Sequence, residues 1–228
     1  MTHFPTRRMA LTLAVAAGVT LAIGAPAAAK VSDQQKLVDE STQTLQLFLG
    51  DKELTWLRAN IGKAKAVIIA PSVVKAGFIF GGSGGQGVVL ARGKDGKWAG
   101  PAFYKLGTAS VGFQAGVSDS AVVALVMNQK ALDSLMAGSF KLGADASVAA
   151  GPVGGGAKSN LKADVIAYSK SKGLYGGVNF SGTGIATNNN WSEKFYGQKP
   201  LTPVDILVTR TVKPQPGAEG LLATVNAR

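Results

Sequence analysis

The feature that most constrains this chain is a glycine run, FGGSGGQGVVL, at residues 80–90. It places five glycines in seven positions, and from Gly82 to Gly87 it fits the dinucleotide-binding pattern G-x-G-x-x-G. That pattern holds a pyrophosphate only where a helix follows, because the helix N-terminus supplies the amide groups. Gly87 instead leads into a β-branched run too short for a helix, and Val88 stands where a Walker loop needs lysine. We therefore expect no nucleotide site, and a glycine turn joining two strands, GFIF and GVVLAR.

From Ala66 onward, apolar residues recur with a period of two between glycine-containing turns, a pattern typical of strands. Residues 109–117 alternate apolar side chains with an almost bare face of Ser, Gly and Gln, and residues 142–150 repeat the arrangement. Strands without bulk on one face bend sharply or admit another backbone at close range. We therefore expect a strongly coiled antiparallel β-sheet that could close like a barrel, with helices over one side.

Residues 32–61 are predicted to be helical, because apolar residues recur there at spacings of three and four, with a break at Gly50. Ser32 and Gln35 make a capping box at the start of this segment. Another helix is expected in QKALDSLMAG, with Asn128 as its N-cap, and short helices in WSEKFYG and AEGLLATVNAR. The fold class predicted is α+β: an N-terminal helical segment, the coiled sheet and a few short helices.

The N-terminal residues predict an exported protein. Arg7 and Arg8 precede an uncharged run, residues 9–29, that ends in APAAA, the composition of a secretory signal peptide cleaved after Ala29. A membrane anchor is the less favoured interpretation, and both general and twin-arginine export stay open. We expect a signal at residues 1–29, a domain at 30–198 and a C-terminal extension at 199–228 packed on that domain. The expected location is the periplasm or envelope of a bacterium.

Composition limits the partners of the chain. It has no cysteine, which excludes disulfides and thiolate metal sites. The formal net charge of +11 falls to +9 without Arg7 and Arg8, leaving 22 basic and 13 acidic residues. Such a surplus favours anionic partners, and an exported protein meets lipid more readily than DNA. We expect an anionic lipid or membrane surface and no nucleic acid as partner, although the charge could also serve solubility alone.

The residues give no catalytic signature. His3 is the only histidine and leaves with the signal, which removes histidine-based triads and metal sites. The pattern S-x-x-K occurs from Ser72 to Lys75 and at residues 159–162, without the companion motifs of a serine–lysine enzyme. Carboxylate pairs among the aspartates are not forced by spacing, and Asp145 is expected to be a hydrogen-bonded structural residue. We therefore expect no enzyme, no cofactor and no metal.

Five blocks of the sequence stand out in order: AKAVIIAPSVVKAGFIFGGSGGQGVVLAR, WAGPAFYKLGTASVGFQAG, LVMNQKALDSL, KLGADASVAAGPVG and AYSKSKGLYGGVNFSG. In these blocks the chain resembles the SYLF-domain family, over residues 36–198. The resemblance implies a lipid-binding module without catalytic activity. Eukaryotic members associate with phosphoinositide membranes and cortical actin, and bacterial members are exported envelope proteins. Actin binding does not carry over to an exported protein, whereas lipid association does.

The residues themselves point to a candidate lipid-binding site where basic side chains gather around an aromatic one: Lys52, Trp56, Arg58, Lys63, Lys65 and Lys75. This composition is typical of a surface at a membrane interface. The competing interpretation places Trp56 in the core and scatters the lysines. The predicted function is a non-enzymatic envelope protein that binds anionic phospholipid or phosphoinositide-like head groups. The alternative is an envelope scaffold or assembly protein that acts through a protein partner.

Overall fold

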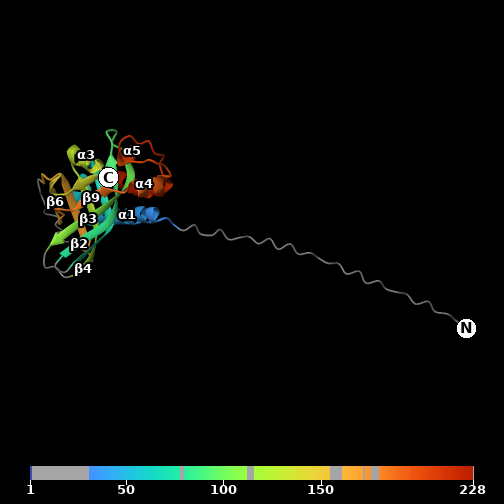
Figure 1. The fold of residues 1–228 in the computed structure, drawn as a ribbon, viewed down its shortest axis with the longest axis horizontal. Coiled ribbons are helices and arrows are strands. Elements are labelled where there is room, and N and C mark those ends of the chain that lie inside the picture. The colour runs from blue at the N-terminus through green and yellow to red at the C-terminus, as the bar shows by residue number, and fades with distance from the viewer. Residues whose placement is uncertain are drawn as a thin grey trace. The chain divides into compact units, whose positions relative to one another are not determined.

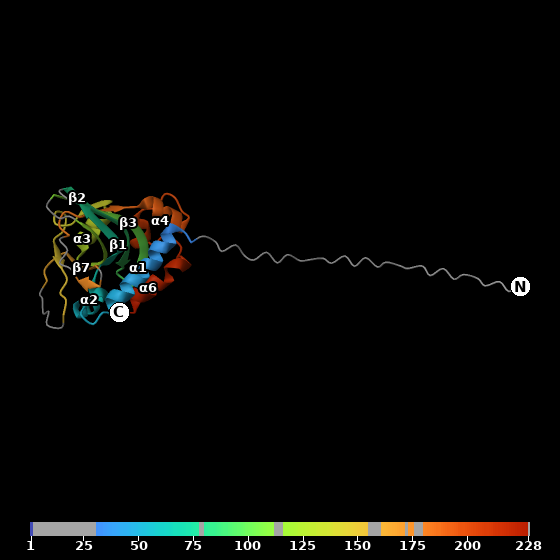
Figure 2. The same cartoon turned by 90° about the horizontal axis from the view of Figure 1, so that it is seen from below.

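The computed structural model describes residue 1 and residues 31–77, 80–111, 116–154, 161–171, 173–175 and 180–227. Residues Val31–Arg228 form one compact unit (Figures 1 and 2). Its helices are α1 (Asp33–Gly50), α2 (Thr55–Asn60), α3 (Gln129–Met136), α4 (Asn189–Tyr196), α5 (Pro203–Leu207) and α6 (Glu219–Asn226), with 3-10 turns η1 (Ile61–Lys63) and η2 (Pro216–Ala218). Its strands are β1 (Ala66–Gly77), β2 (Phe80–Arg92), β3 (Trp98–Val111), β4 (Gly116–Val126), β5 (Ser139–Lys141), β6 (Val148–Ala150), β7 (Val165–Ser171), β8 (Leu174–Tyr175) and β9 (Gly184–Thr187).

The described strands form one curled sheet in the order β5-β9-β3-β2-β1-β4-β7-β6, with β8 paired to β7 (Figure 1). β5 and β6 lie at opposite ends of this order, yet only residues 142–147 separate them in the sequence. A connector this short spans at most about 25 Å when extended. Eight strands laid flat would span roughly 34 Å. The sheet must therefore curl until its two ends approach each other, which confirms the predicted coiling.

One pair of strands departs from the predicted antiparallel pattern. β6 runs parallel to β7, with Val148 opposite Val165, and the other described pairs are antiparallel. The sheet is therefore mixed. The parallel pair is a consequence of the connector, because the chain crosses directly from β5 to the far edge of the sheet instead of turning back as a hairpin.

Helices cover both faces of the sheet, whereas the sequence predicted them over one. Strand segments such as residues 66–70 are buried on both sides, and their side chains alternate between two apolar clusters. One cluster contains Leu142 and Ala146 of the connector, so it lies on the concave face, where α3 and α5 also pack. The other, on the convex face, receives the apolar side chains of α1, α2 and α6. A strand that is buried on both faces has apolar residues at every position, which explains the apolar run AVIIA at residues 66–70.

The glycine run is part of a strand, and the predicted glycine turn is wrong. β2 passes through all five glycines and continues to Arg92, so a strand and not a helix follows Gly87. Gly85 and Gly87 are needed by the neighbouring strand, because β1 has a register shift between Ile69 and Ser72. A side-chain carbon at Gly85 would overlap the carbonyl oxygen of Ser72, and one at Gly87 would lie 2.6 Å from that of Ile69. Residues 78–79, between β1 and β2, lie outside the described residues.

The sequence predicted two strands with one face of small residues, 109–117 and 142–150, and the structure differs between them. Residues 109–111 end β3 and residues 116–117 begin β4, while 112–115 and the side chains of 109–117 lie outside the described residues. Residues 142–150 are not one strand: Leu142 bridges to Ala146 around a turn, and β6 follows. A hydrogen bond stabilises this turn: Asp145 Oδ2 accepts from the backbone N–H of Lys141, the last residue of β5, at 2.7 Å. Asp145 is thus hydrogen-bonded, as predicted.

The helix boundaries follow the predicted caps with one exception. Ser32 Oγ accepts a hydrogen bond from the N–H of Gln35 at 3.1 Å, but the Gln35 amide donates to the carbonyl of Gly217 and to Asp39 instead of completing a capping box. Asn128 Oδ1 accepts a hydrogen bond from Ala131 at the start of α3. The helices predicted in WSEKFYG and AEGLLATVNAR correspond to α4 and α6.

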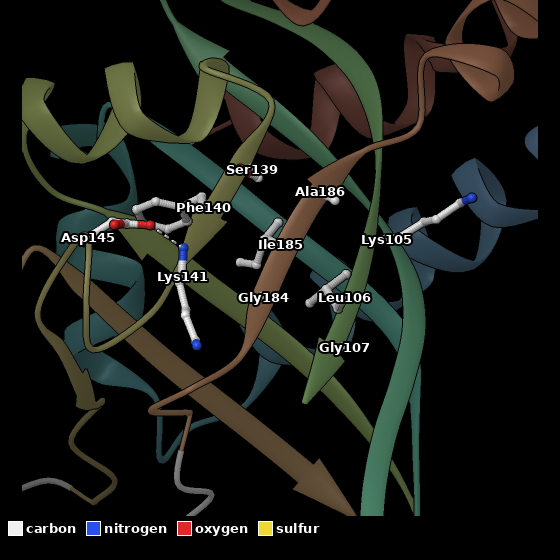
Figure 3. A pocket seen from close by; sticks show the side chains of 10 residues that line it. All are labelled: Lys105, Leu106, Gly107, Ser139, Phe140, Lys141, Asp145, Gly184, Ile185 and Ala186. Carbon is white, nitrogen blue, oxygen red and sulfur yellow. Dashed lines mark hydrogen bonds between the residues drawn. The ribbon is translucent and has the colours of Figure 1, made fainter. Parts of the chain in front are cut away.

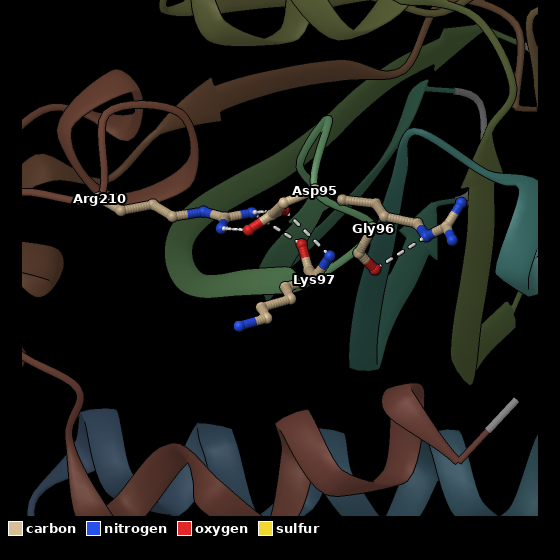
Figure 4. A network of polar contacts seen from close by, with 5 residues as sticks. Asp95, Gly96, Lys97 and Arg210 are labelled. Atoms are coloured by element: carbon tan, nitrogen blue, oxygen red, sulfur yellow. Dashed lines mark hydrogen bonds and ion pairs between the residues drawn. The ribbon is translucent and has the colours of Figure 1, made fainter.

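A polar clamp fixes the segment after α5 to the β2–β3 turn (Figure 4). Arg210 Nη1 lies 2.7 Å from Asp95 Oδ2, and Nη2 lies 3.1 Å from Oδ1. Nη2 also donates to the carbonyl of Lys97 at 2.7 Å. This ion pair, with the hydrogen bond from the Lys97 N–H, lowers the pKa of Asp95. Arg210 has a backbone φ of 54°, a left-handed conformation that is unfavourable for a side chain and is retained here by these contacts.

Candidate functional site

Asp51 is the polar centre of the turn between α1 and α2. Its Oδ2 accepts a hydrogen bond from the Tyr175 hydroxyl at 2.6 Å and lies 3.0 Å from Lys170 Nζ. Its Oδ1 accepts the backbone N–H of Glu53 at 3.0 Å. The hydrogen bond from Tyr175, then those from Lys170 and Glu53, lower the pKa of Asp51 to about 2. An ionised carboxylate therefore ties the β7–β8 hairpin to the end of α1.

The hairpin is also held by its aromatic residue. The Tyr175 ring meets the Phe48 ring edge-on, with centroids 6.1 Å apart, and Lys170 Nζ lies 4.9 Å from the Tyr175 ring centroid. Burial, with the hydrogen bond to Asp51, raises the pKa of the Tyr175 phenol. These contacts fix the position of Leu174, the neighbouring residue at the hairpin tip.

Three exposed aliphatic side chains belong to segments that contact this turn. Leu174 is 75% exposed, Leu47 on α1 is 69% exposed and Val153 is 45% exposed. Leu47 lines a surface cavity of about 610 Å³ together with Asp51 and Lys170. Val153 precedes Gly154, whose N–H donates to the carbonyl of Glu53 at 2.9 Å. We call the surface formed by Leu47, Asp51, Lys52, Glu53, Arg58, Val153, Lys170 and Leu174 the α1–α2 surface.

Two of the six predicted site residues lie on the α1–α2 surface. Lys52 is exposed in the turn. Arg58 donates to the carbonyl of Lys52 at 3.3 Å and to that of Asp51, so its cation satisfies carbonyl groups just beyond the end of α1. Trp56 packs partly buried against the convex apolar cluster, as the competing interpretation held. It contributes to the attachment of α2 to the sheet.

The other three predicted lysines spread away from this surface. Lys63 Nζ donates to Asn60 Oδ1 at 3.4 Å, one turn beyond α2. Lys65 precedes β1, and its N–H donates to the carbonyl of Val126. Lys75 lies ten residues after Lys65, near the far end of β1, which places it roughly 33 Å from Lys65 along the strand direction. The sequence grouped these lysines by proximity along the chain, but the length of β1 separates Lys75 from the rest.

The sequence reasoning missed the residues that reach the α1–α2 surface from distant parts of the chain. Lys170 and Leu174 come from the β7–β8 hairpin, and Val153 comes from the segment after β6. A local signal did exist for the hairpin, because SKSKGLYGG sets an apolar pair among lysines and glycines. Leu47 lies outside the buried stripe of α1, which also marks it as a surface residue.

The S-x-x-K serine and the aspartate considered as catalytic candidates make hydrogen bonds within the fold. Ser72 Oγ donates to Asp119 Oδ1 at 2.8 Å, and Lys75 lies three positions further along the same strand, where side chains point to the opposite face. The second S-x-x-K begins at residue 159, outside the described residues. Asp164 accepts hydrogen bonds from Ser147 and from the Asn128 amide, which lower its pKa.

Two negative findings hold for the residues that the structure describes. Over these ranges, no group of three or more acidic or histidine side chains is arranged to hold a metal ion. Among the helices in the same ranges, none is long and apolar enough to cross a bilayer.

Known proteins resemble this chain over most of its length. The family Ysc84, described as Las17-binding protein actin regulator, matches residues 107–228. Protein YSC84 of Saccharomyces cerevisiae is 34% identical over 190 residues, which cover 80% of this chain and 40% of that protein. SH3 domain-containing YSC84-like protein 1 of Homo sapiens is 35% identical over 159 residues, which cover 68% of this chain and 46% of that protein. The matched region therefore spans less than half the length of either relative.

Proposed function

Because this chain belongs to the SYLF-domain family of Ysc84-like proteins, we propose that it is a non-catalytic protein of the bacterial envelope that binds anionic phospholipid through the α1–α2 surface. The family is associated with lipid binding and actin regulation. The signal-like sequence at residues 1–29 supports export, and an exported protein does not meet actin. Lipid association is therefore the family property proposed for this chain.

The observation that carries the proposal is the grouping of exposed Leu47 with Asp51 and Lys170 around one surface cavity, with Lys52 exposed in the same turn and exposed Leu174 on the hairpin that the Lys170–Asp51 pair holds. A leucine side chain removed from water contributes about 2 kcal/mol, and each Lys or Arg near an anionic surface contributes about 1 kcal/mol. Neither contribution alone gives stable membrane association. Together, exposed leucines with Lys52 and Arg58 bring the sum into the range of measurable vesicle binding.

The acidic residues of the surface do not cancel this attraction. Asp51 is ionised but already paired with Lys170 and hydrogen-bonded by Tyr175, so its charge is largely neutralised locally. Glu53 is exposed and remains the one acidic side chain of the α1–α2 surface besides Asp51. Lys52 and Arg58 therefore leave a positive balance at the turn, and Lys63, which follows α2, is the next basic side chain along the chain.

The test is co-sedimentation of the exported protein with vesicles of phosphatidylglycerol or of phosphatidylcholine, at low and high salt. We expect binding to the anionic vesicles, weakened by salt and strongly reduced in Leu47→Ser/Leu174→Ser. The matched control is Val204→Ser/Val208→Ser, which changes two exposed valines outside the α1–α2 surface and should bind normally. Equal sedimentation with both vesicle types, or normal binding by the leucine variant, would exclude the proposal.

A further inference from the structure

A second surface feature lies where β5, β9 and β3 run side by side. On each strand an inward, buried residue is flanked by two outward residues: Phe140 on β5, Ile185 on β9 and Leu106 on β3. The ladder places the six outward residues in two rows across the strands, Lys105–Ala186–Ser139 and Gly107–Gly184–Lys141. Two lysines thus occupy opposite corners of a rectangle whose other members are small.

This rectangle is the floor and rim of a cavity of about 610 Å³ (Figure 3). The floor is formed by residues with small or no side chains, and the two lysines project at its edges. β9 is hydrogen-bonded to β3 on one side and to β5 on the other, so its backbone groups are occupied by the ladder. Donors available to a ligand are therefore the side chains: the amino groups of Lys105 and Lys141 and the hydroxyl of Ser139.

The charge of the cavity selects its ligand. Lys105 and Lys141 supply two positive charges, and the Asp145 carboxylate on the rim supplies one negative charge while accepting the N–H of Lys141. The balance of one positive charge suits a monoanion. From the ladder spacings the two lysine Cα atoms lie roughly 12 Å apart, so two extended side chains can reach one group between them.

In Figure 3 the side chains of Lys105 and Lys141 point away from each other, and both residues are exposed. Exposed lysine side chains change rotamer on the picosecond to nanosecond scale, so this orientation does not prevent them from closing over a ligand. A tetrahedral monoanion has two free oxygens that share the negative charge, so it can accept hydrogen bonds from both lysines at once. The small residues Gly184 and Ala186 between them leave room for its substituents.

We propose that this cavity binds a phosphodiester monoanion, held between Lys105 and Lys141 with Ser139 as a third donor. The group could come from a phospholipid head group or from a free soluble diester, since both present the same two oxygens. The site is formed by β3, β5 and β9 and shares no residue with the α1–α2 surface. Its occupancy is therefore independent of vesicle binding through that surface.

Calorimetric titration tests the site with three probes: glycerophosphoglycerol, monomeric dihexanoyl-phosphatidylglycerol and inorganic phosphate. We expect saturable binding of both diesters, lowered about tenfold by each of Lys105→Ala and Lys141→Ala because each removes a charge-assisted hydrogen bond. Ala186→Leu, which fills the floor, should also weaken binding. Equal affinity for the two diesters assigns the site to the phosphodiester alone, and tighter binding of the lipid assigns it to a head group with chain contacts.

The matched controls are Lys94→Ala/Lys213→Ala, two exposed lysines elsewhere, and Lys52→Ala/Lys63→Ala near the α1–α2 turn. All of these should titrate as the unmodified protein does. The proposal is overturned if neither diester binds, if inorganic phosphate binds more tightly than the diesters, or if the Lys105 and Lys141 variants keep full affinity. Since the lysine variants change only exposed side chains, their thermal unfolding should match that of the unmodified protein.

Discussion

Lys170 and Asp51 form an ion pair across 119 residues of sequence, with Nζ 3.0 Å from Oδ2. The pair joins the β7–β8 hairpin, which carries exposed Leu174, to the end of α1, where exposed Leu47 lines a cavity with both members of the pair. Exposed leucines are scattered singly on most proteins, but here a polar contact connects two segments that each carry one. The relationship between these two residues therefore connects the fold to the proposed membrane contact.

Asp51→Asn should make the unfolding free energy less dependent on acid pH. The pKa of Asp51 is lowered from 3.8 to about 2 in the folded protein, so the ionised carboxylate stabilises the fold above pH 4 and loses that effect as the pH falls towards 2. Because the carboxylate is one-fifth exposed, we expect a difference of about 1 kcal/mol at neutral pH. Urea unfolding of both proteins between pH 7 and pH 2 measures it. A gap that stays constant across this range contradicts the assignment.

Lys52→Ala/Lys63→Ala should weaken binding to phosphatidylglycerol vesicles about thirtyfold at low salt, because each lysine contributes about 1 kcal/mol near an anionic surface. The difference should shrink as salt screens the charges. Vesicle titrations at several salt concentrations measure both effects. Lys94→Ala/Lys213→Ala removes the same net charge from other exposed positions and serves as the control. Equal losses in the two double variants would mean that total charge matters and the α1–α2 turn does not.

Gly85→Ala should destabilise the fold by about 1 to 3 kcal/mol, because its methyl group would overlap the backbone of the shifted segment of β1. Gly84→Ala is the control one position away. There the methyl group would lie 3.9 Å from the nearest heavy atom, an ordinary contact, so little change is expected. Thermal unfolding distinguishes the two. If both alanines are tolerated, the glycine run is not a requirement of the strand pairing.

Arg210→Gly and Arg210→Ala separate the two contributions at the clamp in Figure 4. Both variants lose the bidentate contact with Asp95, but glycine adopts a positive φ without strain whereas alanine does not. The expected order of melting temperature is Arg210, then Gly, then Ala. Calorimetry of the three proteins checks this order. An alanine variant as stable as the glycine variant would show that the backbone relaxes when the clamp is lost.

The sheet could be predicted because its signals are local. The apolar run of β1 and the N-caps at Ser32 and Asn128 each involve neighbouring residues, and the structure confirms them. The prediction of a glycine turn failed because Gly85 and Gly87 serve another purpose. They leave room for the backbone of the neighbouring strand β1 at its register shift. The helices on both faces were also missed, although a fully apolar segment such as residues 66–70 is itself a signal for a strand buried on both sides.

The candidate site was predicted only in its local half. Lys52 and Arg58 are close in the sequence and also in space, because the Arg58 guanidinium donates to the Lys52 carbonyl. Lys170 and Leu174 contribute through tertiary contacts with Asp51 and Phe48, which no spacing along the chain reveals. Lys75 was misplaced because the continuation of β1 past Pro71 could not be deduced from a sequence in which proline usually ends a strand.

The most direct measurement uses the absence of cysteine from the chain. A single cysteine at position 174, labelled with an environment-sensitive fluorophore such as NBD, reports whether the hairpin tip enters a bilayer. We expect a blue shift and a rise in intensity on addition of phosphatidylglycerol vesicles, and no change for the same label at position 208, an exposed valine outside the α1–α2 surface. No response at position 174, or an equal response at both positions, would contradict the proposed membrane contact.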